Sequence, residues 1–463
     1  MTDLTLLQLN IEYGGTGVDF DKVVQVVRES GATVAAVQEG CGNMPRLSEA
    51  LGWPYVDNRS QVVSQLPLLD PPGAAHGVVL VELEPRRVIA IVNVHPPSRR
   101  YGPFRVSKGR GLIAHERRIR LAALQPSLDA ARQLMAGDVP VVLLGDFNAP
   151  SHRDWTEATV GTRPHLTRAV RWPTSIATEE AGLVDAYRAV HPDAVTHPGL
   201  TWPAARPHVE GYHPEADGHA ADRIDLMFVS PDVVVDDVQI VGEPESPFTQ
   251  VGFSPWPTDH RGLLARLTVS PTIAPPLVSV ARRVVTLGDD IDVRVTCSDL
   301  GSVVVVPRGG DVDAAVLELA APDEGPWRLR TEALGPGRFD VVALSVDAAE
   351  CARTPMWVAG ADHRPSVTPG RTDLAVGEPI EVRWSWTPGN RADWIAVFPR
   401  GATPGVDRHV MQLATNATVD GSGTFSKLTH PRRWPLPPGD YTVHLLMDDL
   451  PVSLASCDFR ILP

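Results

Sequence analysis

The chain from residue 278 onward consists of two copies of one pattern, and this repeat restricts the possible fold more than any other feature of the sequence. Each copy is about 90 residues long and combines short apolar runs with Gly and Pro turns. That combination is typical of a small β-sandwich. We therefore expect two all-β sandwich domains, over 278–360 and 367–463. The matching segments occur in the same order in both copies: 278–296 with 367–385, 302–310 with 394–402, and 334–344 with 436–446.

Residues 1–270 have a different pattern, in which helical and strand periodicities are mixed. Helices are expected at 19–30 and 115–135. Some expected strands alternate with helices and others follow one another directly, which favours an α+β fold with mixed sheets. Three prolines in 271–277 predict a stiff linker before the first sandwich. The expected strands lie at 5–9, 33–37, 78–83, 88–94, 139–144, 224–229 and 263–269.

Composition excludes several classes of protein. The net charge of −14 argues against a surface that binds nucleic acid all over, although it allows a local basic groove. No apolar run reaches the length of a membrane-spanning helix. The first residues lack the basic and apolar pattern of a secretory leader, so we expect a cytoplasmic location. Cys297 and Cys351 fall on segments that can face each other, but Cys457 lacks a partner, and we expect free buried thiols.

The segment VVLLGDFNAP at 141–150 is the first candidate for chemistry. Four apolar residues lead to Asp146 and Asn148, which lie two apart and so point to the same side of an extended chain. A carboxylate and an amide at a strand end suit activation of water and positioning of a phosphate oxygen. The same Gly-Asp-x-Asn pattern is also ordinary turn chemistry. By itself, the segment fits either interpretation.

Polar side chains mark the ends of other expected strands as well. A single Asn or Glu at such a place is usually a turn residue, and a single His can be a hydrogen-bonded core residue. Together, however, they place carboxylates, amides and imidazoles at the end of one strand after another, which indicates a shared site. These residues are Asn10, Glu12, Glu39, His95, Asp225, Asp259 and His260.

Taken in order, these motifs resemble the endonuclease/exonuclease/phosphatase superfamily, which includes DNase I. The resemblance covers residues 3–270 and rests on LQLNIEY, a Gln-Glu pair, Asn-x-His, GDFN, Arg-Ile-Asp and a final Asp-His. It implies a four-layer α/β/β/α sandwich. It also implies hydrolysis of phosphoesters with Mg²⁺ or Mn²⁺ as cofactor.

The resemblance further implies roles for the marked residues. Glu39 would be the main metal ligand, helped by Asn10 and Asp259, with Glu12 as a possible further ligand. Asp146 would orient or deprotonate the attacking water, and Asn148 would hold a phosphate oxygen. His260, kept charged by Asp225, would stabilise negative charge on the phosphoryl group. His95 would donate to the phosphate or assist the leaving group.

An arginine-rich stretch follows His95 and bears on the substrate. Arg99, Arg100 and Arg105, together with Trp202, are candidates to bind it, whether it is a nucleic acid, a phosphorylated small molecule or a lipid headgroup. The helix arginines Arg117, Arg118 and Arg120 fit a solvated outer face equally well.

The alternative to a phosphoester hydrolase is a non-catalytic binding or scaffold protein with a nuclease-like platform. In either case the sandwiches are candidates to bind a protein partner. Residues 392–401, ADWIAVFPRG, are similar to a strand of SKICH-type sandwiches and to a generic immunoglobulin-like strand.

Overall fold

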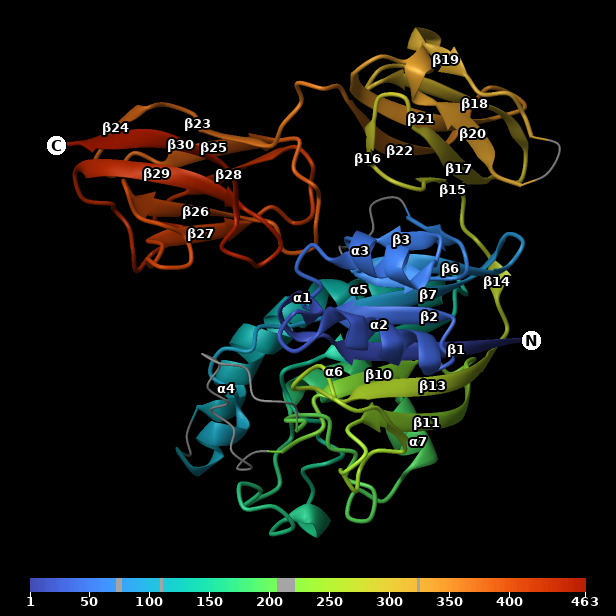
Figure 1. Cartoon of the computed structure of the whole chain (residues 1–463), viewed down its shortest axis with the longest axis vertical. Helices are drawn as coiled ribbons and strands as arrows, with labels where there is room; N and C mark the ends of the chain where they lie inside the picture. The colour runs from blue at the N-terminus through green and yellow to red at the C-terminus, as the bar shows by residue number, and fades with distance from the viewer. Residues whose placement is uncertain (72–76, 109–110, 206–220, 323–324) are drawn as a thin grey trace. The chain divides into compact units, whose positions relative to one another are not determined.

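A computed structural model describes residues 1–71, 77–108, 111–205, 221–322 and 325–463 of the chain (Figure 1). The chain divides into two compact units, Met1–Pro275 and Pro276–Pro463, and each is considered by itself. No helix among the described residues is both long and apolar enough to cross a membrane.

The first unit contains two mixed sheets. In the first sheet, β1 runs parallel to β2 and antiparallel to β13. The alternation of the 2–10 segment places Leu4 and Leu6 on one face and Leu7 and Leu9 on the other, and both faces are buried. The strand order is β12 (Val251–Gly252), β11 (Val234–Gly242), β13 (Gly262–Val269), β1 (Thr2–Asn10), β2 (Val34–Gln38), β4 (Val62–Ser64) and β3 (Tyr55–Asp57).

In the second sheet, β7 runs parallel to β8, and β8 runs antiparallel to β10. The first residues of the expected linker form β14 (Thr272–Ile273), which pairs with β7. The finer domain boundaries at 278–360 and 367–463 stay a prediction. The order in this sheet is β5 (Leu68–Leu69), β6 (Val78–Glu84), β7 (Arg87–Val94), β8 (Val141–Asp146), β10 (Asp225–Val229) and β9 (Val184–Asp185).

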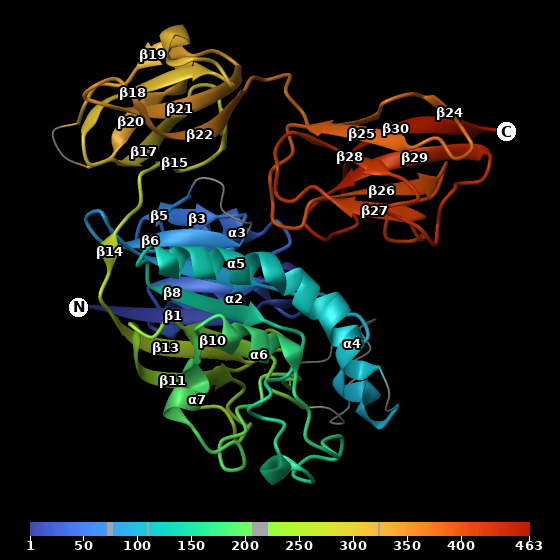
Figure 2. The same ribbon diagram turned by 180° about the vertical axis from the view of Figure 1, so that it is seen from behind.

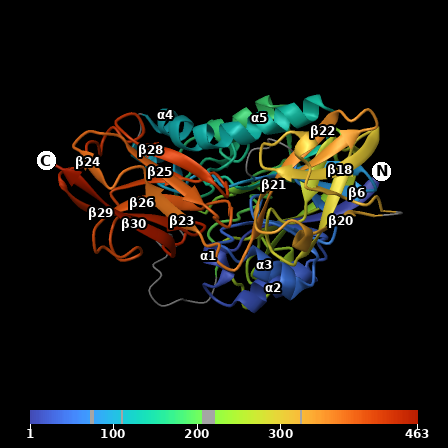
Figure 3. The ribbon, with the colours of Figure 1, turned by 90° about the horizontal axis from the view of Figure 1, so that it is seen from above.

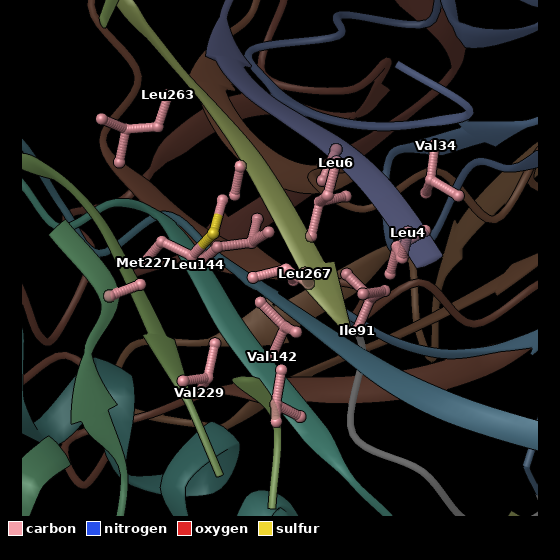
Figure 4. Packing of buried hydrophobic residues seen from close by; sticks show 14 of the residues in the cluster. Leu4, Leu6, Val34, Ile91, Val142, Leu144, Met227, Val229, Leu263 and Leu267 are labelled. Carbon is pink, nitrogen blue, oxygen red and sulfur yellow. The ribbon is translucent and has the colours of Figure 1, made fainter. Parts of the chain in front are cut away.

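The two sheets pack face to face, and helices cover their outer faces. Figure 4 shows the shared core, to which Leu4 and Leu6 of the first sheet and Leu144 and Met227 of the second contribute. Helices α2 (Phe20–Glu29) and α3 (Met44–Leu51) bury apolar residues against the outer face of the first sheet. Helix α5 (Ala122–Ala136) packs on β7 and β8, and Figures 2 and 3 show it on the opposite side of this unit from α2 and α3. The expected four-layer α/β/β/α sandwich is confirmed.

Local sequence signals explain the helix ends. Asp19 caps α2 by accepting the N–H of Asp21, as its position before an apolar helical pattern predicts. The helix expected at 115–135 is confirmed, but a π turn at Arg117–Leu121 joins α4 (Leu112–Glu116) to α5. The remaining helices are α1 (Glu12–Gly15), α6 (Pro173–Glu180), α7 (Ala186–Val190) and short 3₁₀ turns at Pro103–Lys108, Glu157–Thr159, Val312–Ala314 and Thr331–Ala333.

The second unit is all-β among its described residues, and its two halves share one strand order. The first half has a sheet of β15 (Leu277–Val280), β17 (Asp290–Thr296) and β20 (Trp327–Arg330), and a sheet of β16 (Val284–Thr286), β22 (Glu350–Ala359), β21 (Gly337–Ser345), β18 (Leu300–Pro307) and β19 (Leu317–Glu318). The second half repeats this order with β23 (Ser366–Pro369), β25 (Ile380–Ser385) and β28 (Gly421–Phe425), and with β24 (Asp373–Ala375), β30 (Ser453–Leu462), β29 (Gly439–Leu446), β26 (Trp394–Pro399) and β27 (Met411–Ala414).

One expectation for this unit is wrong. Cys297 and Cys351 form a disulfide, with their Cα atoms 6.5 Å apart. Cys297 follows β17 of one sheet and Cys351 lies in β22 of the other, so the bond joins the two sheets of the first half. Cys457 is a free and partly exposed thiol, as expected except for its exposure.

Candidate active site

Strand directions bring the marked residues to one edge of the two sheets. The parallel strands β1 and β2 end at Asn10 and Gln38. In the facing sheet, β8 ends at Asp146, and β10, which runs the other way, begins at Asp225 directly opposite. The loop before β13 adds Asp259 and His260. Residues that are far apart in the sequence therefore meet at the same edge.

Gly145 lets β8 reach this edge. Its φ is 141°, and a Cβ placed there would lie 2.0 Å from the carbonyl oxygen of Val94. A larger residue would push β8 away from β7, so the glycine of the GDFN motif is required by the close approach of two strands.

Asp146 lies at the centre of the site and is almost fully buried. Its Oδ2 atom is 3.1 Å from Nδ2 of Asn10, 3.5 Å from Nε2 of His95 and 3.7 Å from Nε2 of His260. Its Oδ1 atom accepts the backbone N–H of Asn148 at 2.7 Å. Burial would raise the pKa of Asp146, but the neighbouring His260 and His95 outweigh it and lower the pKa below its ordinary value.

His260 and Asp225 form a buried pair. Nδ1 of His260 lies 2.9 Å from Oδ2 of Asp225, which turns the other ring nitrogen towards Asp146 and Asn10. Burial alone would lower the pKa of His260. The carboxylates of Asp225, Asp259 and Asp146 outweigh burial and raise that pKa well above its ordinary value, so the ring is held in its charged form.

Glu39 follows β2 and has a left-handed backbone with φ of 58°. This conformation is costly for a residue with a side chain and is common at functional sites. It lets Oε1 accept from Nδ2 of Asn10 at 3.2 Å and Oε2 accept the N–H of Tyr13 at 3.0 Å. Oε1 also lies 3.9 Å from Nε2 of His95. The side chain is 26% exposed, so a ligand can reach it from solvent.

Two further residues hold the site together. Glu12 is buried, donates its N–H to Oδ1 of Asn10 and accepts the N–H of Asp259 through Oε2 at 3.2 Å. Asn148 also has a left-handed backbone, with φ of 49°. Its amide group donates to the carbonyl of Pro96 at 3.1 Å and to Oδ2 of Asp146 at 3.2 Å. In this state, both of its amide protons are therefore committed within the protein.

The donor set fits a hard divalent cation. Asp146, Asp225 and His260 bring one donor atom each within 4.8 Å of one another, close enough to hold an ion. Both oxygens of Asp225, however, accept hydrogen bonds from Gln8 and His260, and its side chain is fully buried, whereas Glu39 and Asp259 are partly exposed. The carboxylates of Glu39 and Asp259 and the amide oxygen of Asn10 are the oxygen donors that Mg²⁺ and Mn²⁺ prefer.

Several residues support the site through contacts that the sequence does not predict. Trp202 donates its ring N–H to Oδ2 of Asp259 at 3.1 Å, so in this state it anchors a candidate metal ligand. Asp222 is fully buried. It accepts from Tyr101 at 3.1 Å and Trp155 at 2.9 Å, and it lies 3.0 Å from Nε2 of His165. These partners are more than 50 residues away along the chain, so only the fold brings them together.

Arg223, in the Arg-Ile-Asp motif, also makes contacts that the sequence does not predict. It is fully buried and pairs with Asp154 and Asp185 at distances of 2.7–3.0 Å. These carboxylates raise its pKa further above its ordinary value despite burial. The motif therefore contributes a structural ion pair from Arg223 and a site residue, Asp225, two positions later.

The arginine-rich stretch divides into different environments. Arg99 and Arg100 are exposed. Arg105 is half-buried, and its Nη1 atom is buried with no hydrogen-bond partner among the residues that the structure describes. Arg120 is not on a solvated face: it is fully buried, pairs with Glu116 at 2.7 Å and donates to the carbonyls of Ser98 and Arg99. It therefore holds the loop after β7 in place. The remaining helix arginines, Arg117 and Arg118, are exposed, as expected for a solvated outer face of the helix.

A sequence model of the endonuclease/exonuclease/phosphatase family matches residues 7–260. The match covers more than half of the chain and includes every residue of the candidate site. The chain therefore belongs to the endonuclease/exonuclease/phosphatase family, whose members hydrolyse phosphoesters. An uncharacterized protein from Caenorhabditis elegans is 34% identical over 137 residues, which are 28% of this chain and 41% of that protein. The chain thus spans less than half the length of this relative.

Several solved structures are similar to this chain at low sequence identity and with TM-scores below 0.5. An endonuclease/exonuclease/phosphatase protein from Beutenbergia cavernae is 15% identical, covers 100% of both chains and has a TM-score of 0.36. An AP endonuclease from Archaeoglobus fulgidus is 14% identical over 57% of this chain and 98% of its own, with a TM-score of 0.37. A 3′-5′ exonuclease from Neisseria meningitidis is 18% identical over the same shares of the two chains, with a TM-score of 0.37.

Proposed function

We propose that the first unit is a divalent-metal-dependent phosphoester hydrolase of the phosphodiesterase, nuclease or phosphatase type. The observation that carries the proposal is the buried His260–Asp225 pair, whose second ring nitrogen faces Asp146 at 3.7 Å. A cationic imidazole beside a carboxylate of lowered pKa combines a charge stabiliser with a base.

In the proposed reaction, water attacks phosphorus and the phosphorus–oxygen bond to the leaving group breaks. Asp146 orients the water and accepts its proton. The charged His260 ring, steered by Asp225, lies against the phosphoryl oxygens that gain negative charge. His95, 23% exposed and 3.5 Å from Asp146, is placed to donate to the phosphate or to the leaving oxygen. Asn148 contacts a phosphate oxygen after exchanging one of its present hydrogen bonds.

Asn10, Glu39 and Asp259 would hold Mg²⁺ or Mn²⁺. When bound, such an ion supplies positive charge that polarises the phosphoryl group. Glu12 keeps two of these ligands in register, because it binds the main chain of Asp259 and the side chain of Asn10.

Arg99, Arg100 and Arg105 are proposed to bind further phosphates of the substrate. Burial lowers the pKa of His115, and the charges of Arg105, Arg118 and Arg100 lower it further, so Arg100 and Arg105 both lie near this ring. Alanine at Arg100 and Arg105 should raise KM for a substrate with several phosphates more than KM for bis-p-nitrophenyl phosphate. Alanine at Arg117, on the exposed helix face, is the matched control and should change neither.

The test is a substrate panel of bis-p-nitrophenyl phosphate, plasmid DNA, RNA and inositol phosphates, each with Mg²⁺, with Mn²⁺ and with EDTA. We expect turnover of at least one substrate that EDTA abolishes. No turnover of any substrate with either metal would instead support the scaffold interpretation, with the sandwiches as candidate sites for a protein partner. A cytoplasmic location stays a prediction.

A further inference from the structure

We infer that Gln8 is a positioning residue of the site, and that a chain of three buried amides, Asn93–Gln38–Gln8, fixes the orientation of Asp225. The inference rests on the proposed function for its catalytic consequence. All three amide side chains are fully buried at the edge where the sheets meet. Gln8 and Gln38 belong to the first sheet, whereas Asn93 and Asp225 belong to the second.

The series of amide hydrogen bonds begins at two backbone carbonyl groups. Nδ2 of Asn93 donates to the carbonyls of Val37 and Ser60, both at 2.7 Å. A carbonyl can only accept, so the orientation of the Asn93 amide follows from its partners and its Oδ1 must face Gln38. Nε2 of Gln38 donates to that oxygen at 2.7 Å.

The orientation of the Asn93 amide fixes the orientation of the next two amides, up to Asp225. Because Gln38 uses Nε2 on Asn93, its Oε1 faces Gln8 and accepts from Nε2 of Gln8 at 2.7 Å. The same nitrogen donates to Oδ1 of Asp225 at 2.8 Å. Reversing the Gln8 amide would set its oxygen against two acceptors. The chain of amides therefore obliges Gln8 to present donors to Asp225.

The consequence for the dyad is geometric. Gln8 occupies Oδ1 of Asp225, and the backbone N–H of Asp225 is held by Oγ1 of Thr201 at 3.1 Å. The carboxylate thus presents only Oδ2 to Nδ1 of His260. That contact orients the ring so that Nε2 faces Asp146. Among the described residues, the Gln8 side chain donates hydrogen bonds to Gln38 and Asp225 and not to Asn10, Glu39, Asp259 or His260, so it acts through Asp225.

A polar atom without a partner supports a role beyond packing. Oε1 of Gln8 is buried and has no hydrogen bond in the part of the chain that the structure describes. An unpaired buried oxygen destabilises the folded state. A purely structural core would favour an apolar residue at this position, whereas a residue that must donate two hydrogen bonds at once needs an amide nitrogen.

The test uses the full chain with the substitution Gln8→Met. Methionine has nearly the same side-chain length and volume as glutamine but cannot donate the two hydrogen bonds. We expect kcat to fall roughly 10- to 100-fold with KM changed less than about twofold. In the Asp225→Asn variant, the same substitution should cause no further loss of kcat, because Gln8 acts through the carboxylate of Asp225. Thr178→Val, which removes a different buried side-chain hydrogen bond in the same unit, is the stability control and should keep wild-type kcat.

A second measurement needs no activity. The Nδ1 proton of His260, bonded to Asp225, should give a far-downfield proton NMR signal in ¹⁵N-histidine-labelled protein. Gln8→Met should shift or broaden this signal, Asp225→Asn should abolish it, and Thr178→Val should leave it unchanged. If the wild type hydrolyses nothing, this signal alone decides the role of Gln8.

The inference would be overturned by a Gln8→Met variant with an unchanged His260 signal. Losses of kcat that add fully to those of Asp225→Asn would overturn it as well. If Gln8→Met does not fold, Gln8→Glu keeps the shape, places a carboxyl group against Asp225 and is judged by the same two measurements.

Discussion

Asp225 and His260 are 35 residues apart in the chain, yet Oδ2 of the carboxylate lies 2.9 Å from Nδ1 of the ring. Both side chains are buried. Burial disfavours the charged ring, and three carboxylates, of which Asp225 has the largest effect, reverse this preference and raise the pKa of His260. The carboxylate of Asp225 therefore helps to keep the buried His260 ring protonated, although burial by itself would favour the neutral ring.

Asp225→Asn should reduce activity and change its pH dependence. Removing the carboxylate leaves burial less opposed, so the pKa of His260 falls and the ring loses its proton at a lower pH. The alkaline limb of the pH–rate profile should move towards acid, and kcat should fall roughly 10- to 100-fold. Asp129→Asn, an exposed carboxylate on α5, is the control. An unshifted alkaline limb would contradict the dyad but not the metal site.

Metal binding should stabilise the first unit. An ion that binds only the folded chain adds stability by mass action, about 2.7 kcal/mol at a concentration 100 times Kd. Thermal melts with and without Mg²⁺ should show a raised Tm in the wild type and in Glu49→Gln, where the residue is exposed on α3. The rise should be lost in Glu39→Gln. An equal rise in both variants would remove Glu39 from the ligand set.

Arg223→Met should destabilise the first unit without touching the site. The substitution leaves the buried carboxylates of Asp154 and Asp185 without their common cation, and breaking such a pair costs roughly 3–5 kcal/mol. Arg266→Met, which removes an exposed pair with Asp237, should cost less than about 1 kcal/mol. Urea denaturation of both variants checks the difference, and similar midpoints would contradict it.

The sequence predicts those residues of the site that belong to short motifs. Asp146 and Asn148 follow an apolar strand, and the order of the motifs resembles a known family, so the layers and the cluster at the sheet edge could be predicted. The amides of Gln8 and Asn93 could not, because their partners are set by the packing of two sheets. Gln8 and Asp225 are 217 residues apart, and nothing local marks that contact.

The same reason explains the disulfide. Cys297 and Cys351 are 54 residues apart, and the sequence favoured free thiols because Cys457 has no evident partner. Only the fold, which places β17 and β22 in the two sheets of one sandwich, brings these two residues together. Long-range pairing is a property of the topology, which a local pattern does not contain.

The central claim is that this cluster hydrolyses phosphoesters with a divalent metal. The most direct measurement compares kcat of the wild type, Asp146→Asn and Glu39→Gln on the best substrate of the panel, with Mg²⁺ and with EDTA, with circular dichroism as a check on folding. We predict EDTA-sensitive turnover in the wild type and a loss of about 10²-fold or more in each folded variant, because each residue acts on the transition state. Near-normal turnover in both variants, or turnover that EDTA leaves unchanged, would contradict the account.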